Sequence, residues 1–213
     1  MNTDKTDETG IDTDTGWQWD TSWSDTGWDT ADTGLAIVTV SNVDDEACTL
    51  DSAWASLSPS AGEEGHRAAA RLEPPAYPFN VTAARIVLFH DYADCLSGGE
   101  YSVQVYVDGS NSPPSTPAPI VTALFPPVLL VGNFRTFQIS FTPALELTGG
   151  DQLFISVDFD GKSPITSCVA MCTNQYQANT NYWSNADNTP YPWATLETYS
   201  INSNIWAEMD GYL

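Results

Sequence analysis

Two acidic clusters have the residue types of a calcium site. Asp158 and Asp160 share one parity at the end of the stretch DQLFISVDFDG, and Asp44, Asp45 and Glu46 follow one another in NVDDEAC. Calcium binds six to eight oxygen atoms, supplied by carboxylates and turn carbonyls. The sequence therefore predicts a structural calcium ion as the cofactor, with solvated turn carboxylates as the alternative interpretation.

Three aromatic residues lie in the loop-rich stretch NTNYWSNADNTPYPW. They are Tyr182, Trp183 and Tyr191, and asparagine and aspartate side chains surround them. A glycan site needs exposed flat rings with a few polar groups beside them. This pattern predicts a glycan platform, and packing of the same rings beneath the loop is the alternative.

Motifs of the common enzyme classes are missing from the chain. It contains no G-x-S-x-G, no H-E-x-x-H and no glycine-rich phosphate loop. Glu208 and Asp210 share one face of AEMDGYL, which resembles the carboxylate strand of jelly-roll glycosidases, but Tyr212 stands where a third carboxylate would follow. Retaining hydrolysis also needs a second carboxyl group about 5 Å away. We therefore expect a protein that is not an enzyme, with a glycoside hydrolase as a remote alternative.

The four cysteines do not have the spacing of a zinc site. They are Cys48, Cys95, Cys168 and Cys172, and neither histidine of the chain lies near them in sequence. An even count of this kind indicates two disulfides and an oxidising compartment. Three pairings are open, and we favour Cys168–Cys172 together with Cys48–Cys95.

Alternation of apolar and polar residues dominates the chain after residue 34. Strand-like stretches are LAIVTVSN, AARIVLFHD, YSVQVYVDG, FRTFQISFTP and DQLFISVDFDG. Turn signals rich in proline, glycine, serine and asparagine separate them. Only residues 62–72 have a pattern compatible with a helix. Many short strands with such joints predict an all-β, jelly-roll-like antiparallel β-sandwich.

The composition divides the chain into two parts. Residues 1–34 hold nine acidic side chains, one lysine and one aliphatic residue, whereas residues 35–213 carry the alternating pattern. The whole chain has a formal net charge of −22 and only six lysines and arginines. Such a charge makes nucleic acid and anionic lipid unfavourable partners. No apolar run reaches the roughly 18 residues of a membrane span.

Tryptophans set the acidic extension 1–34 apart from an ordinary tether. In WQWDTSW, Trp17, Trp19 and Trp23 share one face, and Trp28 follows after a glycine. Burying one indole gives about 2–3 kcal/mol, while ordering one residue costs about 1–2 kcal/mol. The segment would therefore become ordered only by pairing with a sheet edge. We predict that these four tryptophans mediate self-association, with a flexible tether as the alternative.

Longer stretches of the chain resemble a known type of domain. The segments ARIVLFHD…YSVQVYVDGSNSPPSTPAP, FRTFQISFTPALELTGGDQLFISVDFDG and YWSNADNTPYPWATLETYSINSNIWAEMDGYL resemble the jelly-roll accessory domains of secreted bacterial proteins. The extension resembles the Asp/Thr/Gly tethers of bacterial surface lipoproteins. The resemblance implies a non-catalytic module on adhesins, exported enzymes or surface lipoproteins. It also places Trp193 and Trp206 on strands, which implies core positions for both.

Together these observations predict a structural or adhesive protein that is secreted or displayed on a cell surface. Its expected partners are other copies of itself, bound through the N-terminal strand. A carbohydrate-binding module on a surface tether is the alternative, with a glycan as the partner.

Overall fold

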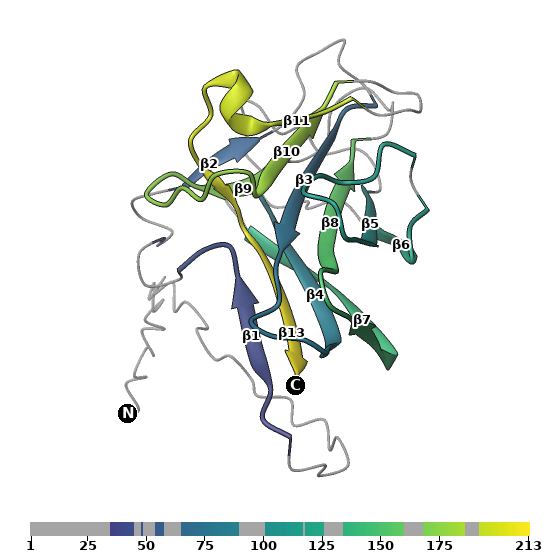
Figure 1. The fold of residues 1–213 in the computed structure, drawn as a ribbon. Helices are drawn as coiled ribbons and strands as arrows, with labels where there is room; N and C mark the ends of the chain where they lie inside the picture. Colours follow the sequence, from purple (N-terminus) through teal and green to yellow (C-terminus); the bar gives the residue numbers. More distant parts are fainter. Residues whose placement is uncertain are drawn as a thin grey trace, which may run out of the picture. The chain divides into compact units, whose positions relative to one another are not determined.

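The alternating stretches form two antiparallel sheets (Figure 1). The computed structural model describes residues 35–44, 48, 54–57, 65–89, 101–116, 118–125, 134–159, 168–185 and 192–213. The all-β class and the antiparallel sandwich predicted from the sequence are confirmed. The extension 1–34, with Trp17, Trp19, Trp23 and Trp28, lies outside these residues, so its role and its boundary stay predictions.

Seven strands make the first sheet within the described part of the chain. Their order is β1-β13-β4-β9-β12, with β7 also paired to β4 and β2 to β9. The strands are β1 (Val38–Ser41), β2 (Trp54–Leu57), β4 (Phe79–Phe89), β7 (Phe134–Leu147), β9 (Cys168–Cys172), β12 (Asn204–Ile205) and β13 (Ala207–Tyr212).

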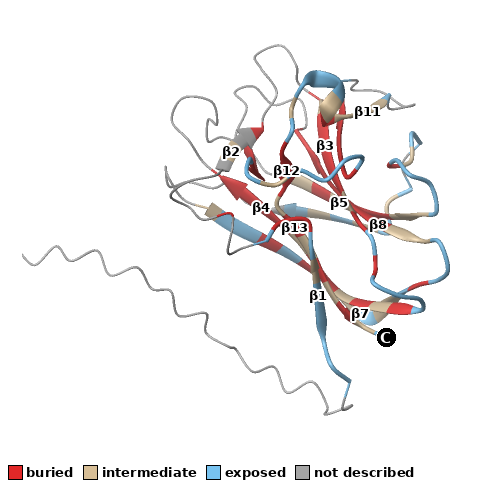
Figure 2. Cartoon of the chain, turned by 60° about the vertical axis from the view of Figure 1, so that its left-hand side comes forward, coloured by how far each residue is buried: buried red, intermediate tan, exposed pale blue. Residues whose placement is uncertain are grey.

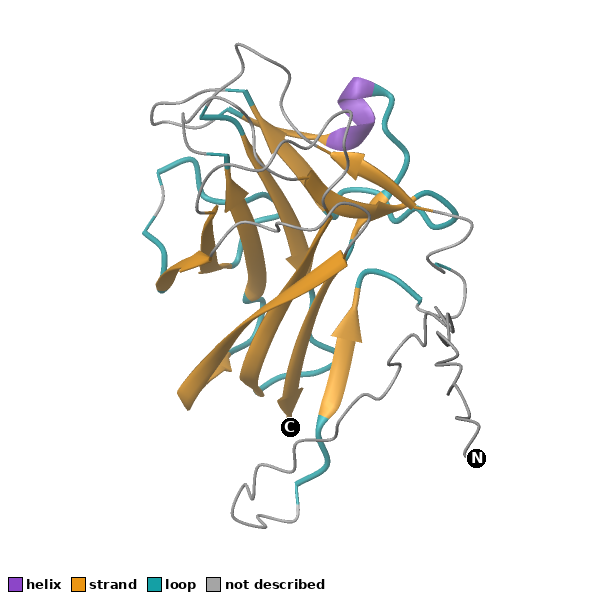
Figure 3. Ribbon diagram, turned by 180° about the vertical axis from the view of Figure 1, so that it is seen from behind, coloured by secondary structure: helices purple, strands orange, loops and turns teal. Residues whose placement is uncertain are grey.

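Six strands make the second sheet, in the order β11-β10-β3-β8-β5-β6. They are β11 (Trp193–Thr195), β10 (Asn181–Ser184), β3 (Arg67–Leu72), β8 (Gln152–Asp158), β5 (Tyr101–Asp108) and β6 (Val121–Phe125). The 3₁₀ turn η1 (Leu196–Tyr199) follows β11 and is the purple segment of Figure 3. Among the described residues no helix is long and apolar enough to cross a membrane.

The main core lies between the two sheets, where the strands are red in Figure 2. Val103 and Val105 of β5 and Ile155 of β8 are fully buried there, as their alternation predicts. Phe137 and Ile139 of β7 enter the same core from the first sheet. The period-two pattern thus identifies the inward faces correctly.

Residues 62–72, the one window with a possible helical pattern, contain a strand instead. β3 runs between β10 and β8, and Ala68, Ala69 and Ala70 have no exposed surface. Alanine has the highest intrinsic helix propensity, but such a preference is worth less than about 1 kcal/mol per residue and tertiary context overrides it. Small side chains on both faces suit a strand in the middle of a sheet that is covered on both sides.

The outward face of the second sheet is buried as well. Tyr106, Phe154, Tyr182 and Ala69 form a separate apolar cluster on that face. The stretch DQLFISVDFDG suggested a polar outward face, yet every residue of β8 after Gln152 is buried. Alternation shows that a strand has two faces, but it does not show whether a second layer covers the polar one.

The cysteine pairing differs from the prediction. Cys48 forms a disulfide with Cys172, with a Cα–Cα separation of 5.7 Å. Cys168 is also disulfide-bonded, and Cys95 lies outside the described residues. The predicted Cys168–Cys172 pair is wrong because both residues lie in β9. Four residues of extended strand span about 13 Å, well beyond the Cα separation that a disulfide allows. Since Cys172 pairs with Cys48, the predicted Cys48–Cys95 pair is wrong too.

Candidate functional site

A turn after β5 lies against the start of β11. Within this turn the backbone N–H of Ser110 donates to Oδ1 of Asp108 at 2.7 Å. The hydroxyl of Ser110 donates to the carbonyl of Ser112, also at 2.7 Å. Such side-chain to backbone hydrogen bonds stabilise a turn without a strand partner. They shape the polar wall of a groove.

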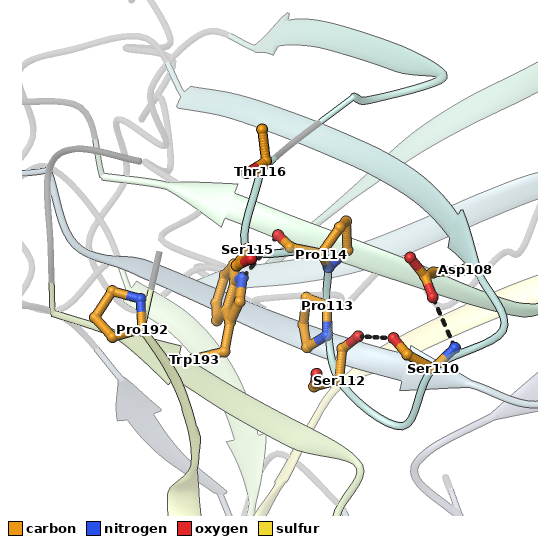
Figure 4. Close-up of a pocket in the computed structure, with 9 residues that line it drawn as sticks. All are labelled: Asp108, Ser110, Ser112, Pro113, Pro114, Ser115, Thr116, Pro192 and Trp193. Carbon is orange, nitrogen blue, oxygen red and sulfur yellow. Dashed lines mark hydrogen bonds between the residues drawn. The ribbon is translucent and has the colours of Figure 1, made fainter. Parts of the chain in front are cut away.

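Trp193 forms the opposite side of this groove (Figure 4). It opens β11, an edge strand, and pairs with Ser184 of β10. Its indole N–H donates to the carbonyl of Pro114 at 3.2 Å. The hydrogen bond and the strand fix the position of the indole. Trp193 is half-buried, so part of its side chain stays accessible.

The groove between turn and strand has a volume of about 610 Å³. Its described lining residues are Asp108, Ser110, Ser112, Pro113, Pro114, Ser115, Thr116, Pro192 and Trp193. It therefore combines an indole and three proline rings with hydroxyl groups and one carboxylate. Aromatic and proline rings can contact the C–H faces of a sugar, and hydroxyl and carboxylate groups can bind its hydroxyls.

Comparison with known proteins gives one informative match. No protein-family model matches the chain, and no curated protein sequence does. A solved structure of the cysteine protease and lectin-like domains of Cwp84, a surface layer associated protein of Clostridium difficile, is similar at a TM-score of 0.50 and 11% identity. The match covers 76% of this chain and 36% of that chain. The likeness is one of fold.

The predicted aromatic platform is not exposed. Tyr182 and Trp183 lie in β10 and are 2% and 8% exposed, one on each face of the sheet. The hydroxyl of Tyr182 lies within hydrogen-bonding distance of the carbonyls of Asn179 and Asn111. Burial, and to a lesser extent Glu197, raises the pKa of Tyr182, although Arg71 opposes the rise. Both rings therefore pack among buried side chains of the sheet, and Tyr191, the third residue of the predicted platform, lies outside the described residues.

Trp183 nevertheless lines a second cavity. This cavity has a volume of about 380 Å³, and its described lining residues are Leu57, His66, Trp183, Asn185, Leu196, Tyr199 and Ile201. The indole of Trp183 packs edge-on against His66, with 5.5 Å between ring centroids, and against Phe159 at 5.7 Å. The ring is therefore held on two sides within the core.

The turn η1, which supplies Leu196 and Tyr199 to this cavity, is anchored by Glu197. Oε1 of Glu197 accepts hydrogen bonds from the hydroxyl of Tyr176 at 2.9 Å and the backbone N–H of Asn179 at 2.8 Å. Burial alone would raise the pKa of Glu197, but hydrogen bonds, led by that from the Thr195 side chain, lower it below its usual value. The charged form of this carboxylate therefore stabilises the turn.

The predicted calcium ligands occupy different environments. Asp158 is buried and accepts a hydrogen bond from Nη2 of Arg67 at 2.7 Å. Asp44 is exposed, and its backbone exchanges two hydrogen bonds with the side chain of Gln175. Asp45, Glu46 and Asp160 lie outside the described residues. Within the described ranges no three histidine, cysteine or acidic side chains group as metal ligands would, so calcium stays a prediction.

The two carboxylates of β13 are held by one arginine of β4. Nε of Arg85 donates to Glu208 at 3.0 Å, and its two terminal nitrogens donate to Asp210 at 2.5 and 2.6 Å. Burial lowers the pKa of Arg85, but the hydrogen bonds and charges of Asp210 and Glu208 raise it overall. Each carboxylate is thus ion-paired with the same guanidinium. This arrangement is that of a structural ion cluster.

Sequence reasoning missed the two components of the groove. The resemblance places Trp193 on a strand and hence in the core. It does open β11, but β11 lies at the sheet edge and the half-buried indole packs against the outward-face cluster of the second sheet. The turn was interpreted only as a break between strands. The signal available in the sequence was DGSNSPPSTP, whose serines and prolines are unusually dense for a simple connection.

Proposed function

We propose that this chain is a non-catalytic carbohydrate-binding module with an adhesive role, and that an extended glycan binds along the groove beside Trp193. The observation that carries the proposal is the half-buried indole of Trp193, fixed by Pro114 and faced by a hydroxyl-lined turn. Sugar recognition combines stacking on an aromatic ring with a few convergent polar groups. A surface groove of about 610 Å³ lies well within the range of ligand sites and has room for more than one sugar ring.

The proposed location is outside the cell or on its surface. The Cys48–Cys172 disulfide supports this location, because stable disulfides belong to oxidising compartments. The net charge of −22 on the whole chain favours solubility and repels anionic ligands. The ligand is therefore expected to be a neutral rather than an acidic glycan.

A glycan array followed by calorimetry tests this function. We expect Trp193→Ala to weaken binding of an array-selected neutral glycan at least tenfold, and Trp193→Phe to weaken it less because a ring remains. Tyr77→Phe, an exposed tyrosine outside the groove, is the control and should bind like the parent. Unchanged glycan affinity in a folded Trp193→Ala protein would refute the groove as the binding site.

Self-association is a second candidate, favoured by the edge of the first sheet. β1 pairs only with β13 in the described part of the chain. Leu35 and Ile37, just before it, are 46% and 58% exposed, and residues 35–42 contain no charge and no proline. Charges and prolines are the usual protection of an edge strand against pairing. Sedimentation of the full chain and of a chain lacking residues 1–34 tests this candidate; a monomer in both cases would refute it.

A further inference from the structure

The 380 Å³ cavity lies between β2 at an edge of the first sheet, β10 of the second sheet and the turn η1. We infer that this cavity, hereafter the end pocket, binds one sugar residue that carries a methyl group, in a 6-deoxy or an N-acetyl substituent. The inference deepens and rests on the proposed glycan binding. It adds a second site that recognises a single residue, such as a chain end.

Size restricts what the end pocket can hold. Ligand pockets have volumes of roughly 300–1,000 Å³, and at about 380 Å³ the end pocket is near the lower limit. A single ring with its substituents fits such a volume, whereas an extended chain does not. The groove beside Trp193, at about 610 Å³, is the site for the extended part.

Apolar side chains make up much of the wall. Leu57 comes from β2, Leu196 from η1 and Ile201 from the segment after it. None of these side chains can accept or donate a hydrogen bond, so a hydroxyl pressed against them would lose its water partners without compensation. A methyl group at the same place gains from burial. This wall therefore favours a deoxy or acetyl substituent over a hydroxyl.

Aromatic and polar groups complete the pocket. Trp183 offers an indole held by His66 and Phe159, and Tyr199 stands at the rim with 43% of its surface exposed. Asn185, also exposed, carries an amide that can both donate and accept. These groups suit the C–H face and the hydroxyl or amide edge of the same sugar.

The rim of the end pocket is held in place before any ligand binds. The backbone N–H of Ile201 donates to the carbonyl of Leu196 at 3.1 Å, and that of Ser200 donates to the carbonyl of Glu197 at 2.9 Å. Together with the anchor at Glu197, these bonds fix the turn that carries Tyr199. A pre-formed site avoids the ordering cost that a mobile loop would add to binding.

Matched pairs of monosaccharides test the inference on the full chain by calorimetry or ligand-observed NMR. One pair is L-fucose against L-galactose, and the other is N-acetylglucosamine against glucose. We expect the methyl-bearing member of one pair to bind about fourfold tighter, the gain from burying one such group. The pair that discriminates identifies the substituent.

Variants at exposed positions separate this site from the groove. Tyr199→Ala and Asn185→Ala should each weaken binding of the preferred monosaccharide at least fivefold with little change in melting temperature. Trp193→Ala and Asn202→Ala, an exposed asparagine outside the pocket lining, should leave it within twofold. Equal affinity within both pairs, or parent-like binding by folded Tyr199→Ala, would overturn the inference. If no monosaccharide binds while Trp193→Ala still weakens binding of a longer glycan, only the end pocket is refuted. If the preferred monosaccharide binds as expected while Trp193→Ala leaves binding of the longer glycan unchanged, only the groove is refuted.

Discussion

Replacing Asn204 with alanine should be among the most destabilising single changes in the sandwich. Asn204 is 3% exposed and joins three parts of the chain. Its Oδ1 accepts from the backbone N–H of Gln177 and from Nδ2 of Asn181, both at 3.0 Å. Its Nδ2 donates to the carbonyl of Asn42 at 2.8 Å. The residue therefore links the end of β1 to β10 and β12.

The magnitude follows from the partners that the change abandons. Alanine would leave the N–H of Gln177 and the carbonyl of Asn42 without their side-chain partner, while Nδ2 of Asn181 keeps a bond to Thr180 at 2.8 Å. Each buried group that loses its partner costs about 1–3 kcal/mol. The bond to the Asn42 carbonyl is buried and that from the Gln177 N–H is partly buried, so together they predict a loss of about 2–4 kcal/mol in the free energy of unfolding, a large share of a typical total.

Urea denaturation of the oxidised protein, followed by tryptophan fluorescence, measures this loss. Asn202→Ala is the matched control, because Asn202 is exposed in the same segment and should change the free energy by less than about 0.5 kcal/mol. A loss below about 1 kcal/mol for Asn204→Ala, with an unchanged denaturant slope, would contradict the stabilising role assigned to the Asn204 hydrogen bonds.

Four further predictions concern stability. Gly211→Ala should cost several kcal/mol of stability or prevent folding, because its Cβ would come within 2.5 Å of both the Asn80 carbonyl and a Phe79 ring carbon. Gly149→Ala is the control, since a Cβ there meets nothing within 4 Å, and thermal melts compare the two variants. Removing the Cys48–Cys172 bridge by a double serine substitution should lower the free energy of unfolding by up to about 5 kcal/mol, since it joins residues 124 positions apart, and denaturant titration checks this. The pKa of Glu197 is lower in the folded protein than in the unfolded chain. The charged carboxylate therefore stabilises the fold above the ordinary carboxyl pKa, and this stabilisation is lost as pH falls through the folded pKa. The difference in melting temperature between the parent and Glu197→Gln should shrink between about pH 6 and pH 3. Millimolar calcium should raise the melting temperature beyond the effect of matched ionic strength if the predicted calcium site exists.

Local pattern was sufficient to predict the class of the fold and most of its inward faces. Val103 and Val157 are buried and alternate with polar neighbours, and successive side chains of a strand point to opposite sides of a sheet. This geometry is a property of the extended chain itself. It holds wherever the strand is placed, so a sequence can predict it without knowing the neighbours.

The candidate site could not be predicted in the same way. Tyr182 and Trp183 lie in a loop-like stretch but form a central segment of β10, buried on both faces. Trp193 resembles a core residue but opens an edge strand against a turn about 80 residues earlier in the chain. Exposure depends on which layer covers each face, and that layer comes from distant segments.

The alternating strands, the strongly acidic charge and a cysteine count that allows two disulfides all follow from the order of residues alone. The pairing of Cys48 with Cys172, the ion pairs of Arg85 with Glu208 and Asp210, and the accessibility of each aromatic ring arise only from the folded arrangement. These outcomes depend on strand order and register, which bring together residues more than 100 positions apart. Parity along one strand carries no information about such distant partners.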